Sequence, residues 1–133
     1  MVETIAATNA DVWGIDANAY TDDSIENLIG LASRLRAALP DGASDTLVTK
    51  IMLGVFGSVP AFDLYFRNGF QVATFGRKSL LKISRFYEEN AATIEAHRVP
   101  TLGFATGMET AFRYTRAKVI DMNFFVQGGY LTA

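Results

Sequence analysis

The chain has 133 residues, of which half are apolar and a fifth are charged, with a net charge of −2 and no cysteine. This length suits one domain with a real core, and the balance of apolar and charged residues excludes an intrinsically disordered chain. The lack of cysteine excludes disulfides, thiolate catalysis and cysteine-based zinc or iron–sulfur sites. His97 is the only histidine, so the sequence offers no histidine-based metal spacing, and we expect neither a metal nor a cofactor.

The apolar stretch over residues 51–62 is the longest in the chain, and glycine and proline interrupt it. It is shorter than the roughly 20 residues that a membrane-spanning helix requires. The first three residues, Met-Val-Glu, lack the basic start and the apolar run of a secretory signal. We therefore expect a cytoplasmic protein that does not span a membrane.

No pattern organises residues 1–20, which we leave as a poorly defined N-terminal segment. Thr21 then offers a polar cap with two aspartates after it, and apolar residues follow at helical spacing as far as Leu39. Pro40 ends this first predicted helix.

A second, largely buried helix is predicted from a cap at Ser44 or Asp45 to about Phe56. Gly54 and Gly57 lie within it, which indicates either that a neighbouring backbone comes close or that the helix ends at Gly57. Proline at position 60 fits the first turn of a short third helix, which also contains residue 63.

Residues 70–75 are predicted as a loop or a brief strand. Ser79 can cap a long helix that follows. The run Thr-Gly-Met-Glu at 106–109 has the spacing of a capping box and predicts a last helix, which would stop at the glycine pair 128–129. The expected fold is all-α, with about five helices packed as a single compact, bundle-like domain over residues 1–133.

Charge is divided unevenly along the chain, because residues 1–48 carry a net charge of −6 and residues 49–133 a net charge of +4. Between residues 63 and 88 every charge is basic. The residues of this segment are Arg67, Arg77, Lys78, Lys82 and Arg85. They either neutralise the acidic half within one fold or a dimer, or bind phosphate or an acidic partner.

The segment Thr-Lys-Ile-Met-Leu-Gly-Val-Phe-Gly-Ser-Val-Pro-Ala-Phe-Asp at 49–63 carries a first resemblance. It is similar to the C-terminal part of a family of larger bacterial proteins that have no assigned function. The resemblance implies either a shortened relative of these proteins or a chain without their N-terminal half.

Residues 39–63 also resemble the helix-hairpin-helix segment of DNA glycosylases, whose pattern is Leu-Pro-Gly-Val-Gly-x-x-Thr, an apolar helix and Pro-x-x-Asp. The matching positions are Leu39, Pro40, Thr46, Pro60 and Asp63, while the two hairpin glycines fall on Asp41 and Ala43. The resemblance implies DNA binding, with Asp63 as the catalytic carboxylate that stabilises the cationic sugar. The alternative for Asp63 is a carboxylate that faces a helix N-terminus.

The residues favour a non-catalytic helical domain that acts through contacts with a protein partner or as a homo-oligomer, for instance a homodimer. The charge asymmetry and the surplus of apolar helix faces indicate this function. The alternative is a nucleic-acid-binding domain related to the glycosylases, in which the five basic residues bind phosphate.

Overall fold

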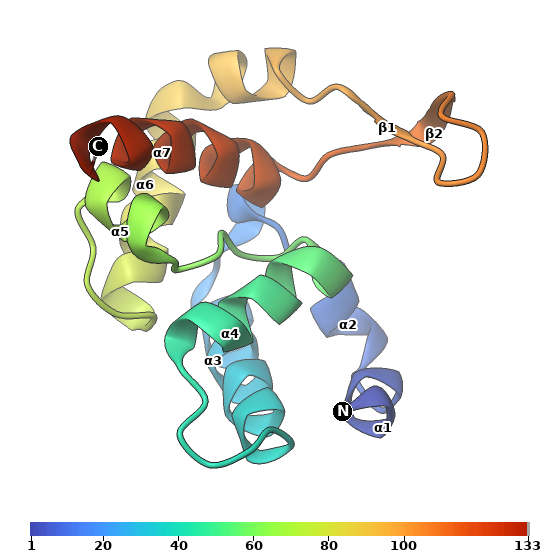
Figure 1. Cartoon of the computed structure of the whole chain (residues 1–133), viewed down its shortest axis with the longest axis vertical. Helices are drawn as coiled ribbons and strands as arrows, with labels where there is room; N and C mark the ends of the chain where they lie inside the picture. Colours follow the sequence, from blue (N-terminus) through green and yellow to red (C-terminus); the bar gives the residue numbers. More distant parts are fainter. Residues whose placement is uncertain (133) are drawn as a thin grey trace.

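Helices dominate the structure, a computed structural model that describes residues 1–132 and confirms the expected mainly helical fold (Figure 1). The part of the chain that it describes contains seven α-helices, one 3-10 helix, one π-helix and one β-hairpin. The elements are α1 (Val2–Ala6), α2 (Ala10–Trp13), η1 (Ala17–Ala19), α3 (Asp22–Ala37), α4 (Asp45–Ile51), the π-helix η2 (Met52–Phe56), α5 (Leu64–Phe70), α6 (Arg77–Ala96), β1 (Pro100–Leu102), β2 (Glu109–Arg113) and α7 (Arg116–Thr132). None of these helices is long and apolar enough to cross a membrane.

The first predicted helix is confirmed as α3, and its start follows the expected chemistry. Thr21 and Ser24 form a reciprocal capping box, in which each side-chain oxygen accepts a hydrogen bond from the other residue's backbone N–H, at 3.1 and 2.7 Å. One face of the helix is then fully buried. Its core residues are Ile25, Leu28, Leu31 and Leu35.

The second predicted helix is confirmed as α4 continued by η2. Ser44 caps it by accepting a hydrogen bond from the N–H of Leu47. Gly57 ends it with a left-handed φ of 65°. The close backbone contact considered at Gly54 is wrong, since a Cβ there would meet no atom within 4 Å.

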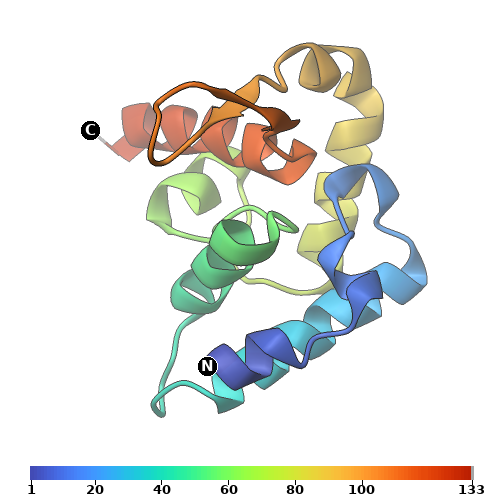
Figure 2. The same cartoon turned by 90° about the vertical axis from the view of Figure 1, so that its right-hand side faces the viewer.

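Glycine does allow a close backbone approach elsewhere, where α5 crosses α7. A Cβ on Gly69 would lie 2.1 Å from the carbonyl oxygen of Phe124, and one on Gly128 would lie 1.6 Å from the carbonyl oxygen of Tyr65. The two helices lie side by side in both views (Figures 1 and 2). The predicted stop at residues 128–129 is therefore wrong, because glycine serves helix packing there and α7 continues to Thr132.

Phenylalanine rings fill the core between α5, α6 and α7. Phe66 contacts Phe62, Phe70 and Phe124, with ring centroids 5.3 to 6.3 Å apart. Phe86 of α6 closes the cluster at 4.9 Å from Phe124. The pair of Phe66 and Phe70 is stacked and the two pairs with Phe124 are edge-to-face, which are the preferred geometries for aromatic pairs.

Two predicted helix starts are displaced. The short third helix begins at Leu64, after an irregular segment that contains Pro60. The long helix α6 begins after Gly76, so Ser79 does not precede the helix but lies in its first turn, where its hydroxyl accepts from the Gly76 N–H at 3.0 Å. Of residues 70–75, predicted as a loop or a brief strand, residues 71–75 form a loop, whereas Phe70 is the last residue of α5.

The last predicted helix is confirmed as α7, but its predicted start at residues 106–109 is wrong, because this segment turns back on itself as a β-hairpin. Thr106 uses its hydroxyl to accept from the Met108 N–H within the turn, at 3.2 Å. Gly107 takes a left-handed φ of 66°, which a helix interior does not allow. The last helix, α7, starts only at Arg116.

Residues 1–20 form α1, α2 and η1, and Asp16 makes a contact there that no local pattern indicates. Asp16 is buried, and its carboxylate accepts hydrogen bonds from the backbone N–H groups of Arg116 and Ala117, both at 2.9 Å, and of Ala17 at 2.7 Å. The N-terminal segment thus supplies the cap for α7, a hundred residues further along the chain.

Candidate functional site

The hairpin projects away from the helices, as Figure 1 shows, and in Figure 2 it lies in front of α7. β1 and β2 are antiparallel, and they form a sheet of only two strands. The hairpin carries four large apolar side chains with little cover from the rest of the chain. Their exposed fractions are 63% for Leu102, 108% for Phe104, 70% for Met108 and 76% for Phe112.

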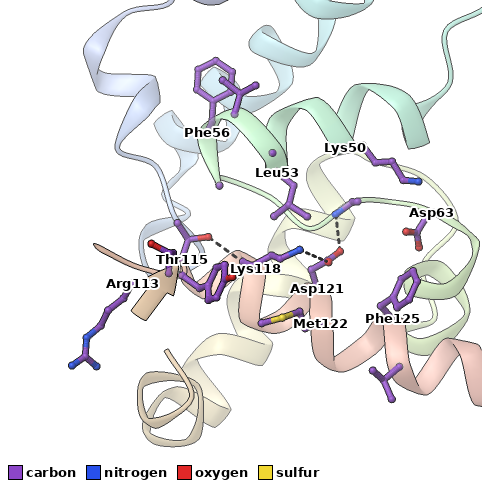
Figure 3. A pocket seen from close by; sticks show the side chains of 17 residues that line it. Lys50, Leu53, Phe56, Asp63, Arg113, Thr115, Lys118, Asp121, Met122 and Phe125 are labelled. Carbon is purple, nitrogen blue, oxygen red and sulfur yellow. Dashed lines mark hydrogen bonds and ion pairs between the residues drawn. The ribbon is translucent and has the colours of Figure 1, made fainter. Parts of the chain in front are cut away.

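A hollow of about 920 Å³ lies between the base of this hairpin, η2, and α7 (Figure 3). Its wall is mostly apolar, with a few charged groups among the apolar side chains. The apolar lining includes Leu53, Val55, Met122, Phe125 and Val126, and the charged lining is Lys50, Asp63, Arg113, Lys118 and Asp121. A concave apolar surface with a few convergent polar groups is the usual form of a binding site.

The wider turn of η2 shapes one wall of the hollow. Met52 and Phe56 of this π-helix are buried, and Leu53, Gly54, Val55 and Phe56 line the hollow. Such π-helical insertions are rare in proteins, and those that occur are often found at functional sites. The lack of a side chain at Gly54 leaves this wall open.

Asp121 is the most perturbed carboxyl group of the hollow. It is 6% exposed, accepts a hydrogen bond from the Ala61 N–H at 3.0 Å and lies 3.8 Å from the Lys118 ammonium. Burial raises the pKa of Asp121 to about 6, against the lowering effect of the Ala61 hydrogen bond and of Lys118, while the nearby Asp63 adds to the rise. This carboxyl group therefore changes its charge close to neutral pH.

Asp63, the predicted catalytic carboxylate, is the N-cap of α5. Its side chain accepts a hydrogen bond from the Phe66 N–H at 2.9 Å. The carboxylate thus faces a helix N-terminus, as the structural alternative expected, although it also borders the hollow (Figure 3). Catalysis by Asp63 remains a prediction.

The five basic residues of the predicted nucleic-acid site differ in whether their side chains already bind other groups of the protein. Arg77 pairs with Asp22 and Glu26 of α3, at 2.6 and 3.4 Å. Lys82 donates to the carbonyl oxygens of Phe70 and Gln71 at the end of α5, at 2.5 and 3.1 Å.

The remaining three basic residues lie on two helices. Arg67 of α5 donates from Nε to the Asp63 carbonyl oxygen at 3.3 Å. Lys78 and Arg85 of α6 are exposed and have no ion pair among residues 1–132. Part of the basic segment therefore neutralises acids within the fold, and nucleic-acid binding stays a prediction.

A partly buried ionic network at the start of α7 has no counterpart in the sequence analysis. Arg116 binds Glu95 through Nε and Nη2, at 2.6 and 3.0 Å, and lies 3.4 Å from a carboxylate oxygen of Asp16. The hydrogen bonds to Glu95 raise the pKa of Arg116, and those from Arg116 lower the pKa of Glu95. This network joins α6, α7 and the N-terminal segment, and it has a structural role.

Comparison with protein-family models, with curated proteins and with solved structures found no match for this chain. Neither predicted resemblance has support from these comparisons, and both remain predictions. Among residues 1–132 no group of three His, Asp or Glu side chains is placed to hold a metal ion. The function proposed below therefore rests on the geometry of the site alone.

Proposed function

We propose that this protein is a non-catalytic helical domain that acts through protein contacts, and that its β-hairpin is the contact element. The observation that carries the proposal is the exposure of Leu102, Phe104, Met108 and Phe112 on one projecting hairpin. Large apolar side chains gathered on a surface mark interaction sites, whereas scattered single ones do not.

The structure of the hairpin supports the same proposal. A two-stranded hairpin is marginally stable in water by itself, and it offers unpaired backbone groups along its edges. A partner that covers the apolar side chains or pairs with an edge would stabilise it. The hollow at the base of the hairpin extends the contact surface onto α7.

Photo-crosslinking from the hairpin tests this function. A benzophenone amino acid replaces Phe104 at the tip, and a matched variant carries it at Ser33, an exposed residue of α3. We expect a covalent protein adduct from position 104 and none from position 33. The adduct is identified by peptide sequencing and its complex is then reconstituted from purified components.

In the reconstituted complex, the Phe104→Ser variant should bind at least about tenfold more weakly, since a buried aromatic contact is worth more than 1.4 kcal/mol. No adduct from position 104, or equal adducts from both positions, would overturn the proposed function.

A further inference from the structure

The outer edge of β2 is one of the two edges of the hairpin that no strand covers within residues 1–132. On the inner side, the Met108 carbonyl accepts from the Gly103 N–H at 2.7 Å, and the Tyr114 N–H donates to the Val99 carbonyl at 3.1 Å. Residues 108 and 114 therefore direct their backbone groups toward β1. Because successive residues of a strand direct these groups to opposite edges, residues 109, 111 and 113 direct theirs outward.

The register of the hairpin agrees with this assignment. Pro100 lies opposite Arg113 and Leu102 opposite Glu109, with an irregularity between the two pairs. The irregularity adds two residues to β2, an even number, so both ends of the strand direct the same alternate residues outward. The Phe112 carbonyl, which accepts from the Thr101 hydroxyl at 3.3 Å, faces the inner edge as expected.

We propose that the partner of this edge is a second copy of the chain, whose β2 pairs with it antiparallel about a twofold axis at Ala111. This inference rests on the proposed function and names the partner. The two hairpins would join into one four-stranded sheet, with Ala111 opposite the second copy's Ala111 and all outward backbone groups of residues 109–113 paired.

We choose a second copy as the partner because the charges of β2 are complementary to those of another β2. Glu109 and Arg113 stand two residues on either side of Ala111. Antiparallel pairing about Ala111 therefore places each Glu109 opposite an Arg113 of the other copy, which gives two ion pairs. A shift of the register by two residues loses both pairs, and a shift by four sets like charges opposite each other.

The side chains of β2 are available for this pairing. Glu109 is exposed and has no hydrogen bond or ion pair from its side chain within residues 1–132. Arg113 is also exposed, and its side chain donates a hydrogen bond only from Nη1, to the Arg98 carbonyl oxygen at 3.2 Å. On the other face of the strand, the exposed Phe112 would lie across from Thr110 of the second copy, where its ring gains cover.

A charge-swap series tests the pairing by sedimentation equilibrium of the purified protein. The wild type should form a dimer. Glu109→Arg and Arg113→Glu each set like charges opposite one another and should each weaken the dimer by about tenfold or more. The double variant Glu109→Arg/Arg113→Glu restores opposite charges at both positions, and its dimer should return to within about threefold of the wild type.

A cysteine placed at the axis checks the register. The chain has no cysteine of its own, so Ala111→Cys can form only a disulfide between copies. Residues opposite each other in a hydrogen-bonded pair lie about 5.5 Å apart between Cα atoms, within reach of a disulfide. Oxidation should link position 111 faster than a matched cysteine at Ala105, in the exposed loop of the same hairpin.

Several outcomes would overturn the self-pairing. A monomeric wild type, a double variant as weak as the single ones, or equal oxidation rates at positions 111 and 105 would each do so. The proposed function fails separately, if Phe104 yields no protein adduct. An adduct with a different protein, formed by a chain that is monomeric alone, would keep the proposed function and reject the second copy.

Discussion

The helices, called the helical body below, bury their phenylalanine rings, whereas the hairpin exposes its phenylalanines to solvent. In the body, Phe62 and Phe66 are fully buried and contact further rings, whereas Phe104 and Phe112 of the hairpin are 108% and 76% exposed. The core of this fold can therefore accommodate large aromatic rings. The core therefore does not need the hairpin side chains, and this contrast supports their proposed role in a contact outside the chain.

The body is also where the structure tolerates the least change. Gly69 and Gly128 bring the backbones of α5 and α7 into direct contact, and Asp16 fixes the start of α7 from the far end of the chain. The hairpin has no comparable support, because its two strands pair only with each other. Changes of equal size should therefore have very different effects in the two regions.

The largest effect is expected from Gly128→Ala. The added methyl group would collide with the Tyr65 backbone, and we expect the free energy of unfolding to fall by about 3 kcal/mol. Gly54→Ala is the matched control, since it meets open space and a helical alanine should add about 0.5–1 kcal/mol. Urea denaturation of both variants measures the difference. Equal effects would mean that α5 and α7 do not meet at these glycines.

Asp16→Ala should have the next largest effect. It removes the acceptor of three backbone N–H groups, including the buried one of Ala117, and the expected loss is about 2–3 kcal/mol. Asp11→Ala, at an exposed position in α2, should change the free energy of unfolding by less than about 0.5 kcal/mol. A variant at position 16 as stable as the one at position 11 would show that the N-terminal segment does not cap α7.

The ionisation of Asp121 should make the stability of the body depend on pH. Its pKa rises from 3.8 to about 6 in the folded state, so between these values the folded protein binds more protons than the unfolded chain. The free energy of unfolding should therefore fall as the pH rises from 4 to about 6, by on the order of 2 kcal/mol from this group.

Asp121→Asn isolates this contribution, because the amide oxygen can still accept from the Ala61 N–H. The difference in free energy of unfolding between wild type and variant, measured by urea denaturation at several pH values, should change over this range. A difference that stays constant with pH would contradict the raised pKa.

The parts of the fold that the sequence could predict are those with local causes. Thr21 and Ser44 cap α3 and α4 through their own neighbouring amides, and Gly57 ends a helix with a φ that glycine prefers. The cap of α7 could not be predicted, since Asp16 lies a hundred residues away from the amides that it binds.

The hairpin was missed for a different physical reason. Thr106 and Glu109 have capping-box spacing. However, the positive φ of Gly107 and the strand-forming run Thr-Ala-Phe-Arg-Tyr at 110–114 favour a turn between two strands. Gly103 and Gly107, which bracket the turn after Pro100, were the available signal.

The candidate site was predictable only in part for the same reason. Asp63 was singled out and does border the hollow, next to Asp121 from α7. Its proximity to Asp121 depends on the crossing of α5 and α7, which no local pattern specifies. The sequence indicates a surplus of apolar surface, but the position of exposed apolar side chains on the hairpin follows from the fold.

Whether the hairpin rings belong to the core is tested by comparing one phenylalanine from each region. The free energy of unfolding is measured for Phe104→Ser and Phe66→Ser at a concentration where the chain is monomeric. We predict a change of less than about 0.5 kcal/mol for Phe104, and a loss of about 3–5 kcal/mol for Phe66, which is fully buried. A loss at Phe104 as large as that at Phe66 would show that the hairpin ring belongs to the folded core and would contradict its assignment as a contact surface.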